Sequence, residues 1–185
     1  MVDYELRAFE TQLKLVVESF RRRVSTLLTG RASPAMVENL TINAYGTEVP
    51  LREVAGINVP ERRLLVIQPY DASILKAIEK ALQSLEFGRA ARNDGRMIQI
   101  TIPTLTPDRQ RQLVKQAAAY REEHAASVRK LRGDLADRFH QWRRRNEISE
   151  DDSLRGQAQA NSLSNKYLSE LDTAIAQKEF EIMEA

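Results

Sequence analysis

The feature that most constrains the fold is a helical repeat of apolar residues that continues over about 39 residues, from 107 to 145. Its members recur three or four positions apart, the spacing of one face of an α-helix. They are Leu113, Ala117, Tyr120, His124, Val128, Leu131, Leu135, Phe139 and Trp142. At ~1.5 Å per residue such a helix spans roughly 58 Å, far more than an average helix of a globular protein. We therefore expect an elongated body.

Two further segments carry the same period. Residues 3–28 place Leu6, Phe9, Leu13, Val16, Phe20, Val24 and Leu27 on one seam. Gly30 and Pro34 end this helix. The third helix follows a break at "NEISEDD", where Ser149 and Asp152 are close to a capping box.

The seam of the third helix is predicted from its apolar residues, with polar Asn161 and Ser164 interrupting it. The apolar residues are Leu154, Ala158, Leu168, Leu171, Ile175 and Ile182. Three long helices with matching seams predict a single three-helix bundle.

Residues 31–106 differ in character, because five of the six prolines and most of the glycines lie there. A strand, a tight turn at Tyr45-Gly46-Thr47 and a returning strand are predicted first. Strands follow in "RRLLVIQPY" and in "RMIQITIP", and Asp71 caps an amphipathic helix between them. This is an α+β module of about the smallest size that folds alone.

The predicted fold class is α+β. An elongated three-helix bundle of residues 1–29 and 107–185 carries a small α/β domain, β-α-β and sandwich-like, inserted after the first helix as residues 31–104. Two short crossings at 29–31 and 103–106 form a hinge, so the expected shape is an L.

Few residues suggest chemistry. The chain has no cysteine, which excludes disulfides and thiolate sites. His124 falls on the inner stripe as a packed residue, and neither it nor His140 has a partner histidine at metal spacing. There is no glycine-rich phosphate loop and no recognisable nucleophile with its base. We expect no catalytic residue, no metal and no cofactor.

The sequence also lacks the features of a membrane or exported protein. No run approaches the ~18 apolar residues that cross a bilayer. The opening "MVDYELRAFE" has no apolar core of a signal peptide. We expect a cytoplasmic protein.

Charge is unevenly distributed. Residues 107–145 hold 11 Lys and Arg against 5 Asp and Glu, whereas residues 146–185 hold 3 against 9. Two antiparallel helices that partly neutralise each other would explain this asymmetry. A basic face for a polyanion would explain it as well.

Arg129 and Arg132 are the best candidates for such a face. They lie three apart within "SVRKLRGDLADRF" and share a helix face with Arg121. The planar guanidinium group matches phosphate oxygens in a way that a lysine does not. The alternative is ion pairing with Asp134 and Asp137 in the same helix, each pair worth a few tenths of a kcal/mol. The residues alone leave both interpretations open.

Six collinear motifs spread over nearly the whole chain resemble the ribosome recycling factor family. They are "LTGRASP" at 28–34, "YGTEVPLREVA" at 45–55, "ITIPTLTPDRQRQLVK" at 100–115, "SVRKLRGD" at 127–134, "NEISEDD" at 146–152 and "KYLSELDTAIAQKEFEIMEA" at 166–185. The resemblance implies a three-helix bundle with an α/β domain on a flexible two-stranded connection.

The resemblance also implies a function. The protein would bind the large ribosomal subunit after termination and split the ribosome together with elongation factor G, which hydrolyses the GTP. It would be a monomer, would need no cofactor or membrane, and would not be an enzyme. Arg129 and Arg132 match the family's rRNA-binding arginines. Gly30 and Arg31, with Leu105 and Thr106, match its hinge.

The sequence departs from the family pattern at a few positions. Leu28 and Gly133 stand where arginine is common, Thr104 replaces a frequent proline, and "DLAD" stands where "DAND" is common. Two competing interpretations are a helical protein–protein adaptor and a generic RNA-binding module without ribosome-splitting activity. A third, an enzyme site in the inserted domain, would require a deep pocket with perturbed titrating groups.

Overall fold

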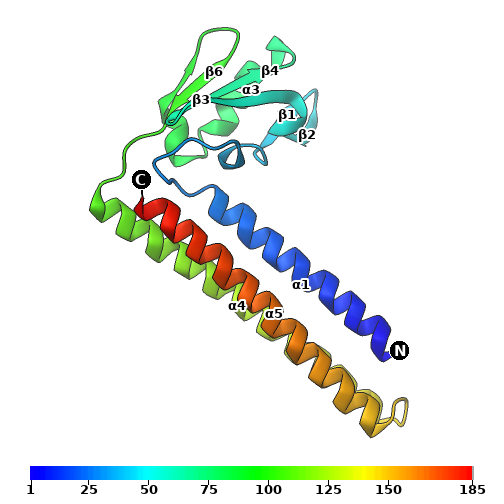
Figure 1. Cartoon of the computed structure of the whole chain (residues 1–185). Coiled ribbons are helices and arrows are strands. Elements are labelled where there is room, and N and C mark those ends of the chain that lie inside the picture. Colours follow the sequence, from blue (N-terminus) through cyan, green and yellow to red (C-terminus); the bar gives the residue numbers. More distant parts are fainter. Residues whose placement is uncertain (185) are drawn as a thin grey trace. The chain divides into compact units, whose positions relative to one another are not determined.

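The computed structural model describes residues 1–184 and has the predicted α+β class. Three long helices lie alongside one another: α1 (Val2–Ser25), α4 (Pro107–Arg144) and α5 (Glu150–Met183), shown in Figure 1. The strands all lie between α1 and α4 in the sequence. The chain divides into two compact units. One combines Met1–Val24 with Gln116–Gln177, and the other combines Ser25–Lys115 with the C-terminal residues from Lys178.

The core of the first unit is the seam between the helices. On α1 the buried side chains are Val2, Leu6, Phe9, Leu13, Val17, Phe20 and Val24. This is the predicted seam with three differences. Val17 is buried in place of Val16, Val2 is added, and Leu27 is buried beyond the end of the helix at Ser25. The prediction of a packed His124 is confirmed. Its ring lies edge-on to Phe20 at 5.4 Å between centroids, and its Nδ1 bonds the Tyr120 carbonyl at 2.7 Å.

The predicted seam of α5 is wrong over its first half. Leu154 is 57% exposed and Ala158 is exposed as well. The buried stripe instead runs through Ser153, Gly156, Ala160, Ser164, Tyr167 and Leu171. Ser164 therefore belongs to the seam that it was expected to interrupt. Its hydroxyl donates to the Ala160 carbonyl at 2.8 Å, which satisfies the buried polar group.

Small residues are buried on α5 because the helices approach closely there. A Cβ atom added to Gly156 would lie 2.8 Å from Cε2 of Phe139 on α4 and 2.9 Å from Cγ1 of Val2 on α1. Phe139 is fully buried and Val2 nearly so. Gly156 is thus the point where all three helices pack against one another.

Predicted caps hold the ends of the two longest helices. The Ser149 hydroxyl accepts from the Asp152 N–H at 3.0 Å and donates to the Asp152 carboxylate at 2.9 Å. The Thr106 hydroxyl accepts from the Arg109 N–H at 3.3 Å, just before α4 begins with Pro107. Both contacts satisfy first-turn donors that have no partner within the helix.

The inserted region holds two antiparallel sheets and two short helices. One sheet pairs β1 with β2, and the other has the strand order β3-β4-β6-β5. The strands are β1 (Thr41–Ala44), β2 (Thr47–Pro50), β3 (Ala55–Glu61), β4 (Leu64–Pro69), β5 (Ala91–Asn93) and β6 (Ile98–Thr101). The helices are α2 (Leu51–Val54) and α3 (Leu75–Leu82), joined by 3₁₀ turns at Pro34–Met36, Ala72–Ile74 and Glu86–Ala90.

Most of the elements observed in this region were predicted from the sequence. Tyr45 and Gly46 have φ of 54° and 77°, as expected for a two-residue hairpin turn. The three isoleucines at 98, 100 and 102 are fully buried, as their alternation predicts. Strands β3 and β5 were not predicted. β3 contains glycine, asparagine and proline, and β5 has only three residues, so neither has the composition or length of a recognisable strand.

Within residues 1–184, no helix combines the length and the apolar character needed to cross a membrane.

Two helix glycines make a matched test of the packing. Gly156→Ala should destabilise the protein by roughly 1–2 kcal/mol, because overpacking a tight core outweighs the better helix propensity of alanine. Gly133→Ala should stabilise it by about 0.5–1 kcal/mol, because nothing lies within 4 Å of the added Cβ. Urea unfolding measures both. Equal effects of the two substitutions would contradict the close approach at Gly156.

Candidate nucleic-acid interface

The predicted arginines lie in the interior of α4. Val128 and Leu135, on the buried stripe of the same helix, have exposed fractions of 0% and 3%. The backbone that carries Arg129 and Arg132 is therefore fixed by packing. The side chain of Arg129 is 44% exposed, and Arg132 is half-buried.

Arg129 belongs to a chain of alternating charges. Its Nη2 donates to Oε1 of Glu122, two helical turns earlier. Nη1 of Arg121 contacts the other oxygen of the same carboxylate at 3.3 Å. Arg121 also bonds Oδ1 of Asp172 on α5, from Nη2 at 2.7 Å and from Nε at 2.9 Å. We call these four residues the charged chain.

The contacts of the charged chain shift the pKa of the Glu122 carboxyl. The pKa of the Glu122 carboxyl lies below its ordinary value, mainly because Arg129 donates a hydrogen bond to it, with a smaller effect of Arg121. The carboxylate is thus held in its ionised form. Because the pair is exposed, water and salt screen it and it adds little to the stability of the fold.

Arg132 differs from Arg129. Among the residues that the structure describes, none forms a hydrogen bond or an ion pair with Arg132. The predicted alternative, pairing of these arginines with Asp134 and Asp137, is wrong. The physical reason is spacing, because separations of two, five or eight residues do not match the three or four that bring side chains together. The observed partner of Arg129 is Glu122, and the guanidinium of Arg132 remains available to an external anion.

The surface beside Arg132 is open, whereas the alanines earlier in α4 are divided between the core and the surface. No atom lies within 4 Å of a Cβ built on Gly133. Ala117 and Ala125 are fully buried in the bundle, whereas Ala118 and Ala126 are exposed. The small residues that permit close approach from outside are therefore Gly133 and the exposed alanines.

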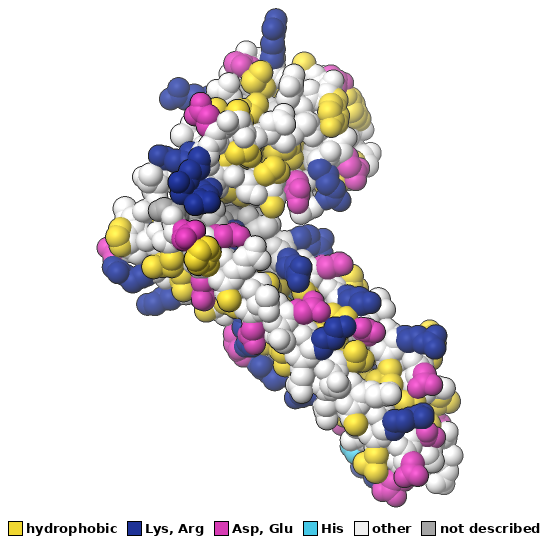
Figure 2. Space-filling model, in the orientation of Figure 1, with side chains coloured by type: hydrophobic (Ala, Val, Ile, Leu, Met, Phe, Trp, Pro, Cys, Tyr) yellow, Lys and Arg dark blue, Asp and Glu magenta, His cyan; other side chains and the backbone are white. Residues whose placement is uncertain are grey.

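Several other arginines of the bundle form ion pairs within the chain. Arg23 pairs with Glu123 and lies 3.8 Å over the centre of the Tyr120 ring. Arg143 contacts Glu150 at 3.4 Å. Figure 2 shows basic and acidic side chains interspersed along the helices on the face drawn. The face drawn carries no continuous basic stripe, so the candidate site is defined by the position of Arg129 and Arg132 on the packed part of α4.

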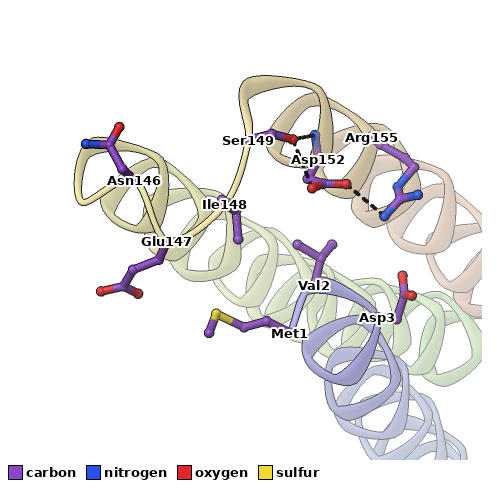
Figure 3. A pocket seen from close by; sticks show the side chains of 9 residues that line it. All are labelled: Met1, Val2, Asp3, Asn146, Glu147, Ile148, Ser149, Asp152 and Arg155. Atoms are coloured by element: carbon purple, nitrogen blue, oxygen red, sulfur yellow. Dashed lines mark hydrogen bonds and ion pairs between the residues drawn. The ribbon is translucent and has the colours of Figure 1, made fainter.

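An open hollow of about 590 Å³ lies between the start of α1 and the turn from α4 to α5 (Figure 3). Three of its polar side chains, Ser149, Asp152 and Arg155, contact one another. Ser149 caps α5 through Asp152, and Asp152 also contacts Arg155 at 3.1 Å. Within residues 1–184, no three His, Asp or Glu side chains gather as a metal site. These contacts cap the start of α5, and we assign no chemical role to the hollow.

The predicted hinge residues border the inserted region. Gly30 is buried with φ of 70°, a conformation that favours glycine. The Thr29 hydroxyl donates to the Arg31 carbonyl at 3.3 Å. On the second crossing Leu105 is half-buried, and Thr106 caps α4.

The turn between β3 and β4 forms backbone hydrogen bonds with the residues next to both crossings. The Ala32 N–H donates to the Arg62 carbonyl at 2.8 Å. The Ile102 N–H donates to the Arg63 carbonyl at 2.7 Å, and Nε of Arg63 donates back to the Ile102 carbonyl at 2.7 Å. Sequence reasoning did not identify Arg63 or Glu122. For Glu122 the only available signal was its two-turn spacing from Arg129, and for Arg63 there was none.

Comparisons with known proteins agree on one family. The family model described as ribosome recycling factor matches residues 20–183. The ribosome-recycling factor of Rubrobacter xylanophilus is 41% identical over 97% of this chain and 97% of its own length. That of Chloroflexus aurantiacus is 43% identical over 99% of both chains.

Solved structures agree as well. A solution structure of the ribosome recycling factor has a TM-score of 0.78 and 32% identity, covering 100% of this chain and 98% of the other. The T. thermophilus ribosome recycling factor, in a structure with E. coli elongation factor G bound to the E. coli post-termination complex, has a TM-score of 0.65 and 31% identity. That match covers 98% of this chain and 99% of the other.

The pairing of Glu122 can be tested by titration. Its folded-state pKa is lowered, so the pair contributes stability above the ordinary glutamate pKa and loses it as pH falls through the lowered value. Arg129→Ala should return the pKa of Glu122 toward its ordinary value, as measured from the carboxyl carbon by NMR. Lys130→Ala, one position along α4, should leave it unchanged. An unaltered titration in Arg129→Ala would show that the pair does not form in solution.

Proposed function

We propose a function for this chain from one premise, namely that it belongs to the ribosome recycling factor family. The chain is a translation factor that binds the large ribosomal subunit after termination. With elongation factor G and GTP, it dissociates the post-termination ribosome so that the subunits are used again. The observation that carries this conclusion is identity above 40% with ribosome-recycling factors over nearly the full length of both chains.

The bundle supplies the grip on RNA. Arg132 has an unpaired guanidinium, and a phosphate oxygen pair matches its planar fork. Arg129 lies three residues away on the same face and adds a second contact. Because the buried stripe of α4 fixes both backbone positions, docking costs little ordering of the main chain. We therefore assign Arg129 and Arg132 to rRNA binding.

The hinge permits force to act on the bound factor. We assign it to residues 29–31 and 103–106, including Gly30, Arg31, Leu105 and Thr106. The backbone bonds at Ala32 and Ile102 support this assignment, because they hold both crossings on the inserted region just beyond these segments. Elongation factor G would then move the inserted domain, residues 31–104, while the bundle, residues 1–29 and 107–185, stays docked.

The chain acts by binding and not by catalysis. Elongation factor G hydrolyses the GTP, so the factor itself needs no cofactor and no nucleophile. Its place of action is the ribosome, which supports a cytoplasmic location. We propose that it works as a monomer, because one bundle carries the arginine face and the inserted domain together.

Arg132→Ala should weaken binding to purified large subunits by about ten- to a hundredfold, the loss expected for a hydrogen bond between charged groups. Splitting of post-termination ribosomes by elongation factor G and GTP should fall with it. Lys130→Ala removes the same charge from a neighbouring position on another face of α4, so it should change binding less than about twofold.

Sedimentation with large subunits and light scattering of splitting ribosomes measure the two effects. Far-ultraviolet circular dichroism should show equal helix content in both variants. If the Arg132→Ala variant splits ribosomes at the wild-type rate, the assignment of Arg132 to rRNA binding is wrong. Binding without any splitting by the unaltered protein would instead favour a generic RNA-binding module.

Salt dependence provides a second test. The logarithm of the affinity for large subunits should fall with the logarithm of salt concentration, with a slope of about −0.7 to −0.9 per phosphate engaged. Arg132→Ala should reduce the steepness by about one such contact, and Lys130→Ala should not. An affinity independent of salt would favour a protein–protein adaptor over an RNA grip.

A further inference from the structure

The two arginines of the interface differ in one respect, since Arg129 is paired within the chain and Arg132 is not. We propose that Glu122 is an internal competitor of the RNA phosphate for Arg129. Its carboxylate occupies the guanidinium in the free protein, gives way when the protein docks, and takes the arginine back on release. This proposal rests on the proposed function.

The geometry permits the exchange. Carboxylates and phosphates are both anions whose oxygens match the arginine fork. Glu122 accepts from Nη2 of Arg129, one of the donors that a phosphate would use. The Glu122 side chain is 62% exposed, which leaves the pair accessible from outside. Arg129 and Glu122 lie seven residues apart on one helix, so both face the same approaching surface.

Within the charged chain, only Arg129 is placed to change partners. Arg121 is held by two contacts to Asp172 on α5 in addition to Glu122, and its side chain is 26% exposed. Among residues 1–184, Glu122 is the one ion-pair partner of Arg129, whose side chain is 44% exposed. Breaking one exposed pair frees Arg129, whereas freeing Arg121 would also break the contact between the two helices.

Because Arg129 must exchange Glu122 for a phosphate, it contributes less free energy to RNA binding than Arg132 does. Arg132 gains a phosphate without losing a protein partner, but Arg129 must first lose Glu122. The released carboxylate then remains near the bound phosphate, and like charges repel. Glu122 therefore moderates the grip, which suits a factor that has to leave the ribosome after each round.

Neutralising Glu122 should therefore strengthen binding. Glu122→Gln is expected to bind large subunits about two- to fivefold tighter, within the range set by loss of an exposed ion pair, and to dissociate more slowly. Glu123→Gln is the matched control. It makes the same change in net charge at the adjacent position, where Glu123 pairs with Arg23 on α1. Its effect on binding should be clearly smaller.

A double-mutant cycle assigns the effect to Arg129. In an Arg129→Ala background, Glu122→Gln should lose its advantage over Glu123→Gln, because the remaining partner of Glu122, Arg121, stays bonded to Asp172. Equal affinities of the two single glutamate variants would overturn the proposal. Weaker binding by Glu122→Gln would also overturn it, since the glutamate would then orient Arg129 for docking.

These results separate the proposal from the function on which it rests. If Arg132→Ala loses affinity while Glu122→Gln behaves like Glu123→Gln, only the competitor role is lost. If Arg132→Ala keeps wild-type affinity, the RNA grip itself is wrong. Urea unfolding should give the same midpoint for Glu122→Gln and the wild-type protein, because the pair is exposed.

Discussion

The unbroken packing of α4 against α1 and α5 is the constraint on which the other features depend. Ala117, Val128 and Phe139 are fully buried along this helix, and a Cβ atom on Gly156 of α5 would meet both α4 and α1. A helix held in this way at successive turns cannot rotate about its axis. The direction in which each exposed residue of α4 points is therefore set by the core, and the arginine face is a consequence of apolar packing.

Function then depends on which charges the fold leaves unpaired. The bundle carries many arginines, and most of those described have a carboxylate partner, so net charge alone would not identify an RNA-binding face. Neither Arg129 nor Arg132 has an acid three or four residues away in the sequence. Arg129 is paired because Glu122 lies two helical turns before it, whereas the residue at the same distance before Arg132 is Ala125. Of the two arginines assigned to the interface, Arg129 is thus paired with a carboxylate, and Arg132 has no ion-pair partner among residues 1–184.

The sequence predicts the parts of the fold that have a strong period or cap. The seams of α1 and α4, the Tyr45–Gly46 turn and the Ser149 cap all have such signals. The seam of α5 was mispredicted because apolar residues were taken as its markers, whereas close helix contact selects Gly156, Ala160 and Ser164. The partner of Arg129 was missed because only separations of three or four residues were considered, whereas Glu122 lies seven residues, two helical turns, away.

The most direct test of the account is where residue 133 lies on the ribosome. The chain has no cysteine, so Gly133→Cys would carry a tethered iron–EDTA probe at a single position beside Arg132. Hydroxyl radicals from this probe should cleave large-subunit rRNA at a defined site. A probe at Leu15→Cys, on the exposed side of α1, provides the comparison. If the Leu15 probe cleaved this rRNA while the Gly133 probe left it intact, α4 would not be the face that meets the ribosome.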